Sequence, residues 1–169
     1  MTLEFKYGLI SGVGISLWVA AEYALGLHTT HLEIGEYTRY FPLLILLIAL
    51  FFLLEKKHSE GPLNPGSSVV SGLTASFLGA LIVYGFNLAY NQWINPEWID
   101  NALAIKVTAM RAHDIGEVEI RRAITAFRHD NSAAGLVTRV IVGLTVFGGI
   151  FSVLLAWVMR QRTSPPSIR

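Results

Sequence analysis

The stretch VVSGLTASFLGALIVYGFNLAY, residues 69–90, contains 22 residues and no charged side chain. A transmembrane helix needs about 20 consecutive, mostly apolar residues, because each residue adds about 1.5 Å toward a hydrocarbon core about 30 Å thick. The stretch meets this requirement. In lipid, only helices and closed barrels satisfy all their backbone hydrogen bonds. The alternating pattern of a barrel strand is absent here, so the stretch predicts a membrane-spanning helix.

Three further segments satisfy the same criterion, namely residues 7–27, 37–54 and 136–159. Hydrophobic residues make up 53% of the 169-residue chain and charged residues only 15%, whereas soluble domains carry about 25% charged residues. We therefore predict an all-α fold, an integral membrane four-helix bundle formed by one domain, residues 1–159. A disordered cytoplasmic tail, residues 160–169, is expected to follow it.

The distribution of lysine and arginine predicts the orientation of these spans. With four spans both termini lie on one side, which carries six basic residues, whereas the short loop 28–36 on the other side has none. The long segment 95–134 on that other side carries five, but long loops count less in this comparison. By the positive-inside rule we expect a multi-pass protein of a bacterial inner (cytoplasmic) membrane with both termini in the cytoplasm. The net charge of only +1 argues against nucleic acid as a partner. The basic residues on the terminal side are Lys6, Lys56, Lys57, Arg160, Arg162 and Arg169.

Residues 9–17 (LISGVGISL) align with residues 69–77 (VVSGLTASF) at an offset of 60. One explanation is a parallel repeat, in which two tandem helical hairpins are related by an axis along the membrane normal. The other is chance, because small residues are common in membrane helices. In either case, small residues spaced by four let helix backbones approach closely, so we predict that the first and third helices pack through them. The proposed helix-packing residues are Gly8, Gly12, Ser16, Gly72, Ser76 and Ala80.

Residues 95–134 have the pattern of an extramembrane amphipathic helical segment rather than of a span. The sequence NPEW predicts a helix start, with Asn95 as the cap and Pro96 at the first helical position. The segment could lie on the outer leaflet, or it could extend the third and fourth spans into water. Three roles are open for it: a structural cap over the bundle, a partner-docking surface, or a substrate-binding lid.

An acidic residue, Glu22, interrupts the apolar stretch ISLWVAAEYALG, residues 15–26, about 7 Å below the expected membrane boundary. Ionisable groups in a membrane are costly and usually face the bundle with a partner. We therefore predict a polar cluster, in which Glu22 pairs with an arginine. Its role could be a static network, or a pocket for a lipid head group, a proton or a partner's charge; alternatively, Glu22 reaches the interface. The cluster comprises Glu22, Arg39, Tyr84, Asn87, Asn91 and Arg139.

No signature of catalysis or of cofactor binding accompanies this cluster. The chain lacks cysteine, which excludes disulfides, thiolate metal sites and a cysteine nucleophile. No zincin, calcium-loop, Walker, Rossmann or nucleophile-elbow motif is present. His28, His31 and Glu33 lie close together in a short loop, but without further ligands nearby they are interpreted as solvated residues. We expect no metal, no cofactor and no enzymatic activity.

Several stretches carry a family resemblance: FKYGLISGVGIS (5–16), EKKH (55–58), SGLTASFLGAL (71–81) and INPEW (94–98). They resemble a bacterial membrane family catalogued only as a domain of unknown function (number four-one-nine-nine), over residues 3–158. The resemblance implies a similar size and a four-span layout. It implies no activity and no functional residue, and Glu22 matches none of these motifs.

Three functions remain open for such a protein. The first is a small structural or accessory subunit, non-enzymatic and acting through residues 92–134. The second is a lipid- or solute-handling, transporter-like protein that uses the cluster around Glu22. The third is an auxiliary partner of a cell-envelope lipid or glycan enzyme. The expected partners are the lipid bilayer, and either another membrane protein or further copies of the chain in a homo-oligomer.

Overall fold

The computed structural model describes residues 1–27, 37–38, 40–61 and 64–163, and every regular element among them is helical. The predicted all-α fold is confirmed for these residues. The sequence predictions for Arg39, for the loop with His28, His31 and Glu33, and for the last six residues of the tail lie outside them. For residues 162 and 163 only the backbone is described.

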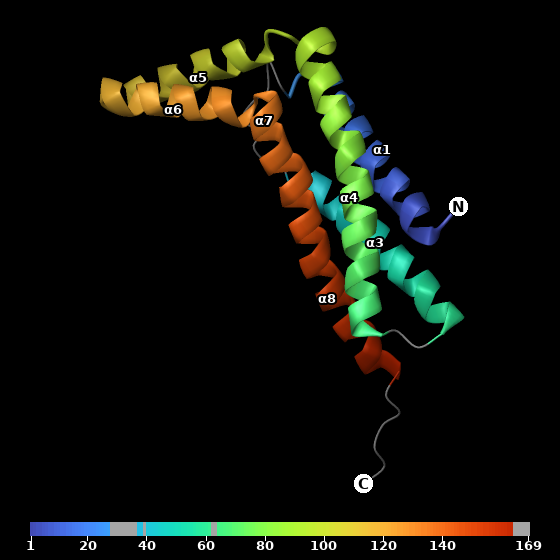
Figure 1. Cartoon of the computed structure of the whole chain (residues 1–169). Helices are drawn as coiled ribbons and strands as arrows, with labels where there is room; N and C mark the ends of the chain where they lie inside the picture. Colours follow the sequence, from blue (N-terminus) through green and yellow to red (C-terminus); the bar gives the residue numbers. More distant parts are fainter. Residues whose placement is uncertain (28–36, 39, 62–63, 164–169) are drawn as a thin grey trace.

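Long helices form a bundle, and two shorter helices form an arm that projects sideways from one end of it (Figure 1). Two helices of the bundle contain a π-helical turn, labelled η. Helix α4 continues into η1, and α7, η2 and α8 together form one continuous helical stretch. The bounds are α1 Leu3–Ala24, α3 Phe41–Glu60, α4 Pro65–Ala89, η1 Tyr90–Ile94, α5 Trp98–Ala112, α6 Glu117–Asp130, α7 Ala133–Leu136, η2 Val137–Val142 and α8 Gly143–Thr163.

Local signals in the sequence explain where the bundle helices begin. The side chain of Thr2 accepts a hydrogen bond from the backbone of Phe5 at the start of α1, and Asn64 caps α4 through the backbone of Gly66. Proline lies in the first turn of both α3 and α4, where its missing N–H costs nothing. Helix α1 ends before Gly26, whose φ of 73° is the left-handed conformation that favours glycine.

Two helical stretches are long and apolar enough to cross a membrane: Pro65–Ile94 with 30 residues and Ala133–Gln161 with 29. Helix α1 has 22 residues but contains Glu4, Lys6 and Glu22, and α3 has 20 residues. The uncharged part of α3, residues 41–54, covers only about 21 Å at about 1.5 Å per residue. By length and composition alone, two of the four expected spans therefore qualify among the described residues.

The beginning of the expected tail is helical, which corrects the prediction of a disordered segment from residue 160. Helix α8 runs on through Thr163.

Helix α4 packs against α1 in a parallel arrangement at very short range. A Cβ atom added to Gly8 would lie 2.7 Å from the carbonyl oxygen of Ala75, and one added to Gly12 would lie 2.8 Å from that of Gly79. Real Cβ atoms do not come this close to backbone oxygens. Two glycines one turn apart therefore let the backbone of α1 rest directly on α4.

The opposite contact of α4, with α8, is built from two reciprocal pairs of small residues. A Cβ atom on Gly72 would overlap the hydroxyl group of Ser152, and a Cβ atom on Gly148 would overlap that of Ser76. Gly72 and Ser76 thus pack against α8, and not against α1 as the sequence suggested. The reason is that α4 carries small residues on two faces, and α8 has its own Gly148–Ser152 pair.

The bundle places small polar side chains inside and large apolar ones outside. Ser11, Ser68, Ser76 and Ser152 are each at most 1% exposed. Buried hydroxyl groups on a helix can donate to the carbonyl one turn back, as Ser16 does to Gly12 at 2.9 Å. The outward faces of all four bundle helices carry residues that are 41–65% exposed, including Leu9, Val13, Leu17, Leu44, Ile48, Phe52, Leu81, Val146, Ile150 and Val153.

A charged triad joins three helices at the other end of the bundle from the arm. Lys57 of α3 forms an ion pair with Glu4 of α1, and its Nζ donates to the Oγ of Ser71 in α4 at 2.5 Å. The same hydroxyl donates to Oε1 of Glu4 at 3.0 Å. The hydrogen bond from Lys57 holds the pKa of Glu4 below its ordinary value. From the sequence alone, Lys57 is only one of the basic residues that predict the orientation of the spans in the membrane.

The arm is a hairpin of α5 and α6, which an exposed ion pair joins near each end. Arg128 bonds Asp100 at 2.8 Å, and Arg111 bonds Glu117 at 3.1 Å beyond the turn. Because the hairpin turns away from α4 and α8 (Figure 1), it does not extend those helices along their axes.

The start of the arm differs from the prediction in two respects. Helix α5 begins at Trp98, so Asn95 does not cap it and Pro96 is not its first residue. The side-chain amide of Asn95 instead donates to the hydroxyl group of Tyr90 at 3.0 Å. The side chain of Asn95 is therefore used in a contact with Tyr90 and not in a helix cap.

We expect Gly72→Ala to destabilise the protein by about 1–3 kcal/mol, the usual cost of overpacking a close contact. The matched control is Gly85→Ala on the same helix, because a Cβ atom there meets nothing within 4 Å. Thermal unfolding in detergent measures both variants. The double variant Gly72→Ala, Ser152→Gly should regain most of the loss, and equal effects at residues 72 and 85 would contradict the close crossing.

We expect Glu4→Gln to lower stability at neutral pH by about 1–2 kcal/mol, since it removes a charge-assisted bond. The lowered pKa of Glu4 stabilises the fold above the pKa of the unfolded state, and this contribution is lost as the pH falls through the folded-state pKa. Unfolding curves of wild type and variant should therefore converge in acid. Glu55→Gln, on the exposed surface of the same end of α3, serves as control; a gap between wild type and Glu4→Gln that is independent of pH would count against the triad.

Candidate ligand-binding site at the arm end of the bundle

A cavity of about 650 Å³ lies where the four bundle helices meet the arm. Pockets that bind small molecules usually measure about 300–1,000 Å³ and have mostly apolar walls with a few polar groups. This cavity has that character. Its apolar walls are formed chiefly by Ile15 and Val19 of α1, Leu43 of α3, Val83 of α4, and Leu144 and Phe147 of α8.

Glu22 places a carboxylate in the α1 wall of this cavity. Its side chain is only 6% exposed, and its Oε1 accepts a hydrogen bond from the hydroxyl group of Thr38, just before α3. A buried carboxylate is stable only with such donors. The bond also fixes the position of the acid relative to the start of α3.

The α4 wall contributes Asn87 and, from η1, Tyr90. The Nδ2 of Asn87 donates to the backbone oxygen of Val83 at 2.8 Å, which holds the amide along its own helix. Tyr90 is 3% exposed and packs edge-on against Tyr23, with ring centroids 5.8 Å apart. These contacts make this wall rigid.

Arg139, in η2, supplies the basic group of the cavity. No hydrogen bond or ion pair joins its guanidinium group to any residue that the structure describes. The predicted pair between Glu22 and Arg139 is therefore not formed, although both residues line the same cavity. The other predicted partner of Glu22, Arg39, lies outside the described residues.

Both π-helical turns border the cavity. Tyr90 of η1 and Arg139 with Val140 of η2 line it from the two longest helices. A π turn inserts an extra residue into an α-helix and is found frequently at functional sites. Two consecutive residues of η2, one charged and one apolar, line the cavity.

The arm closes one side of the cavity through Trp98, which lines it. The indole Nε1 donates to Oδ1 of Asn91 at 2.7 Å, and Nδ2 of Asn91 reaches the backbone oxygen of Asn131 at 3.5 Å. Asn91 thus connects the bundle to both ends of the arm. The ring of Trp98 also packs against Phe127 of α6, with centroids 6.0 Å apart.

The structure separates the predicted cluster into parts. Glu22, Asn87 and Arg139 line the cavity, Asn91 supports it through Trp98, and Tyr84 packs against the hydrophobic core without lining the cavity. The site has further polar and aromatic members that the predicted cluster did not include, among them Thr38, Tyr40, Tyr90 and Trp98. The sequence signal for Tyr90 and Trp98 is their aromatic character at and just beyond the end of the apolar stretch 69–90, where aromatic residues favour a membrane interface.

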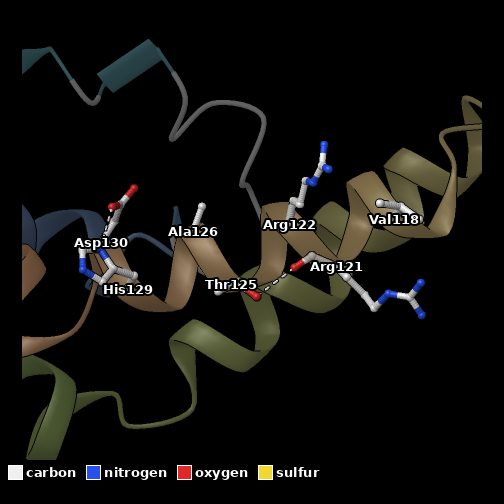
Figure 2. A pocket seen from close by; sticks show the side chains of 7 residues that line it. All are labelled: Val118, Arg121, Arg122, Thr125, Ala126, His129 and Asp130. Atoms are coloured by element: carbon white, nitrogen blue, oxygen red, sulfur yellow. Dashed lines mark hydrogen bonds and ion pairs between the residues drawn. The ribbon is translucent and has the colours of Figure 1, made fainter.

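A second hollow, of about 640 Å³, lies on the exposed face of α6 (Figure 2). Helix α6 provides all of its lining residues, and the side chains of Arg121 and Arg122 point in different directions. Its residues do not converge on one point, whereas the cavity at the end of the bundle draws on several helices. The bundle cavity is therefore the better candidate site.

Comparison with known proteins bears on the family alone. A family described as "Protein of unknown function (DUF4199)" matches residues 6–161. The resemblance inferred from the glycine and aromatic motifs is thereby confirmed. No curated protein and no solved structure matches the chain.

Proposed function

For this chain, which belongs to the DUF4199 family of proteins of unknown function, we propose a binding function inside a membrane. The protein is a non-enzymatic, four-span membrane protein that holds an amphipathic lipid or solute in the cavity at the arm end of the bundle. This corresponds to the lipid- or solute-handling alternative drawn from the sequence. The observation that carries the proposal is the cavity itself, which combines apolar walls with Glu22 and Arg139.

The proposal that all four bundle helices are in lipid rests on their outward faces. In water, large exposed apolar patches are rare and mark interaction sites. Here leucine, isoleucine, valine and phenylalanine cover the outward faces of α1 and α3 as well as those of α4 and α8. Small residues at the helix contacts are the usual composition of membrane bundles. We extend the proposal to a bacterial inner membrane with both termini in the cytoplasm, as the positive-inside rule favours.

Membrane topology is testable because the chain has no cysteine, so each introduced cysteine is unique. We expect Thr108→Cys, on α5, to react with an impermeant maleimide in spheroplasts. Ser59→Cys, at the end of α3, should react only after the membrane is opened. Both positions are exposed in the structure. Labelling of both cysteines in sealed spheroplasts would contradict the four-span arrangement.

The binding function predicts that the protein retains an amphiphile during purification in mild detergent. Val19→Phe fills the cavity, and we expect it to reduce the retained fraction at least tenfold, which corresponds to about 1.4 kcal/mol. Native mass spectrometry measures the bound ligand. Val13→Phe makes the same change on the outward face of the same helix and should retain the amphiphile as wild type does. Equal retention in both variants would refute the site.

An accessory-subunit role is the second candidate, and the arm is the observation that favours it. The α5–α6 hairpin stands away from the bundle (Figure 1), and near its base Trp93 is 78% exposed. An exposed tryptophan at such a position is typical of interface anchors. Recovery of one membrane protein in stoichiometric amount with wild type, but not with Trp93→Ala, would support this role, including a partnership with an envelope lipid or glycan enzyme.

A further inference from the structure

We infer that the ligand of the bundle cavity is a zwitterionic phospholipid, whose phosphate group binds Arg139 and whose ammonium group lies on the Glu22 side. The inference rests on the proposed binding function and specifies the chemical class of the ligand. Three features of the cavity support it: the charge on η2, the opposite charge on α1, and an apolar path to the outside between α3 and α8.

The anionic part of the ligand is assigned by Arg139. An arginine six residues inside an apolar helical stretch of 29 residues is costly unless its charge is compensated. The carboxylate of Asp130 acts on this charge at longer range, but no described residue forms a hydrogen bond or an ion pair with the guanidinium group. The guanidinium group presents five donors in a planar fork, which matches two oxygens of a phosphate group. A phosphate group at this position would supply the missing acceptors.

The negative charge of Glu22 in the opposite wall assigns the cationic part of the ligand. Glu22 lines the cavity from α1, and Arg139 lines it from η2, so a single ligand meets both signs of charge. The Oε1 of Glu22 accepts a hydrogen bond from Thr38, which holds the carboxylate in this wall. A ligand with a second negative charge in place of the ammonium group would be repelled by this wall.

The hydrophobic part is assigned by the way the cavity reaches the outside. Its walls include Leu43 of α3 and Leu144 with Phe147 of α8. Phe147 is 44% exposed, and the neighbouring Leu44 of α3 is 49% exposed. The lining therefore continues from the two charged residues to the outward apolar surface without a polar interruption on α8. An acyl chain can follow this path while the head group stays inside.

The test uses the full chain, purified from vesicles that contain phosphatidylethanolamine and phosphatidylglycerol in equal amounts. Native mass spectrometry gives the number and type of the retained lipids. We expect one lipid per protomer in wild type, with phosphatidylethanolamine enriched at least threefold. Arg139→Gln should lower retention of both lipids at least tenfold. Arg139→Lys keeps the charge without the fork and should fall between them.

Two further variants separate recognition of the lipid head group from general effects of removing a charge. Arg121→Gln, on the exposed face of α6, should retain lipid as wild type does. Glu22→Gln should still retain lipid but lose the preference for phosphatidylethanolamine. Unfolding temperatures of all variants identify any loss of fold, and if Arg139→Gln unfolds, the comparison of wild type with Arg139→Lys decides.

The failures of this inference and of the proposed function are distinguishable. If Arg139→Gln and Arg139→Lys, both folded, retain lipid as wild type does while Val19→Phe does not, the cavity binds an amphiphile but the phosphate assignment is wrong. Equal retention of a long-chain alcohol, which has no phosphate group, would also overturn the phosphate assignment. If wild type carries lipid in variable number with no preference, the lipid is a bulk annulus and the inference is overturned.

Discussion

The near contact of helix backbones along α4 is the constraint on which the rest of the bundle depends. In the membrane that we propose for this protein, the hydrophobic effect does not drive helices together, so their association relies on close packing. Gly8 and Gly12 bring α1 onto one side of α4, and the pairs of Gly72 with Ser152 and Gly148 with Ser76 bring α8 onto the other. Helix α3 then closes the bundle against α1 and α8. At the far end, the triad of Glu4, Lys57 and Ser71 fixes the three helices in register.

This tight packing also explains why the cavity lies at the end of the bundle near the arm. The contacts of glycine and serine cluster in the part of α4 between Gly72 and Gly79. Beyond them the side chains on α4 become larger, with Val83, Asn87 and Tyr90 facing the cavity. Larger side chains hold helices further apart, which leaves space between the walls. The arm covers this space through Trp98 instead of filling it.

Much of the architecture could be predicted from the sequence, because it follows from local signals. Apolar length predicts where α4 and α8 run, small residues predict that helices come close, and amphipathic periodicity predicts the arm. The choice of partner could not be predicted. Gly72 of α4 packs against α8 rather than against α1. Helix α4 carries small residues on two faces, and their spacing does not say which neighbouring helix each face contacts. Similarly, Glu22 and Arg139 have matching depth, but depth does not determine whether two charges meet across a cavity or form a pair. The triad could not be predicted either, because Ser71 has the spacing of a packing residue and Glu4 the position of a flanking charge.

The π turn η2 has a consequence that reaches well beyond the cavity. A π turn takes up about one residue more than an α turn. The residues that follow it therefore lie about 100° around the helix axis from where an uninterrupted α-helix would place them, since an α-helix has about 3.6 residues per turn. Gly148 and Ser152 follow η2 in the same continuous helix, so their orientation toward α4 depends on that rotation. A single inserted residue thus sets two things at once: it turns Arg139 into the cavity and it phases the contact surface of α8. The number of residues in this helix is therefore fixed. Inserting or deleting one residue within it would disturb both ligand binding in the cavity and the packing of α8 against α4.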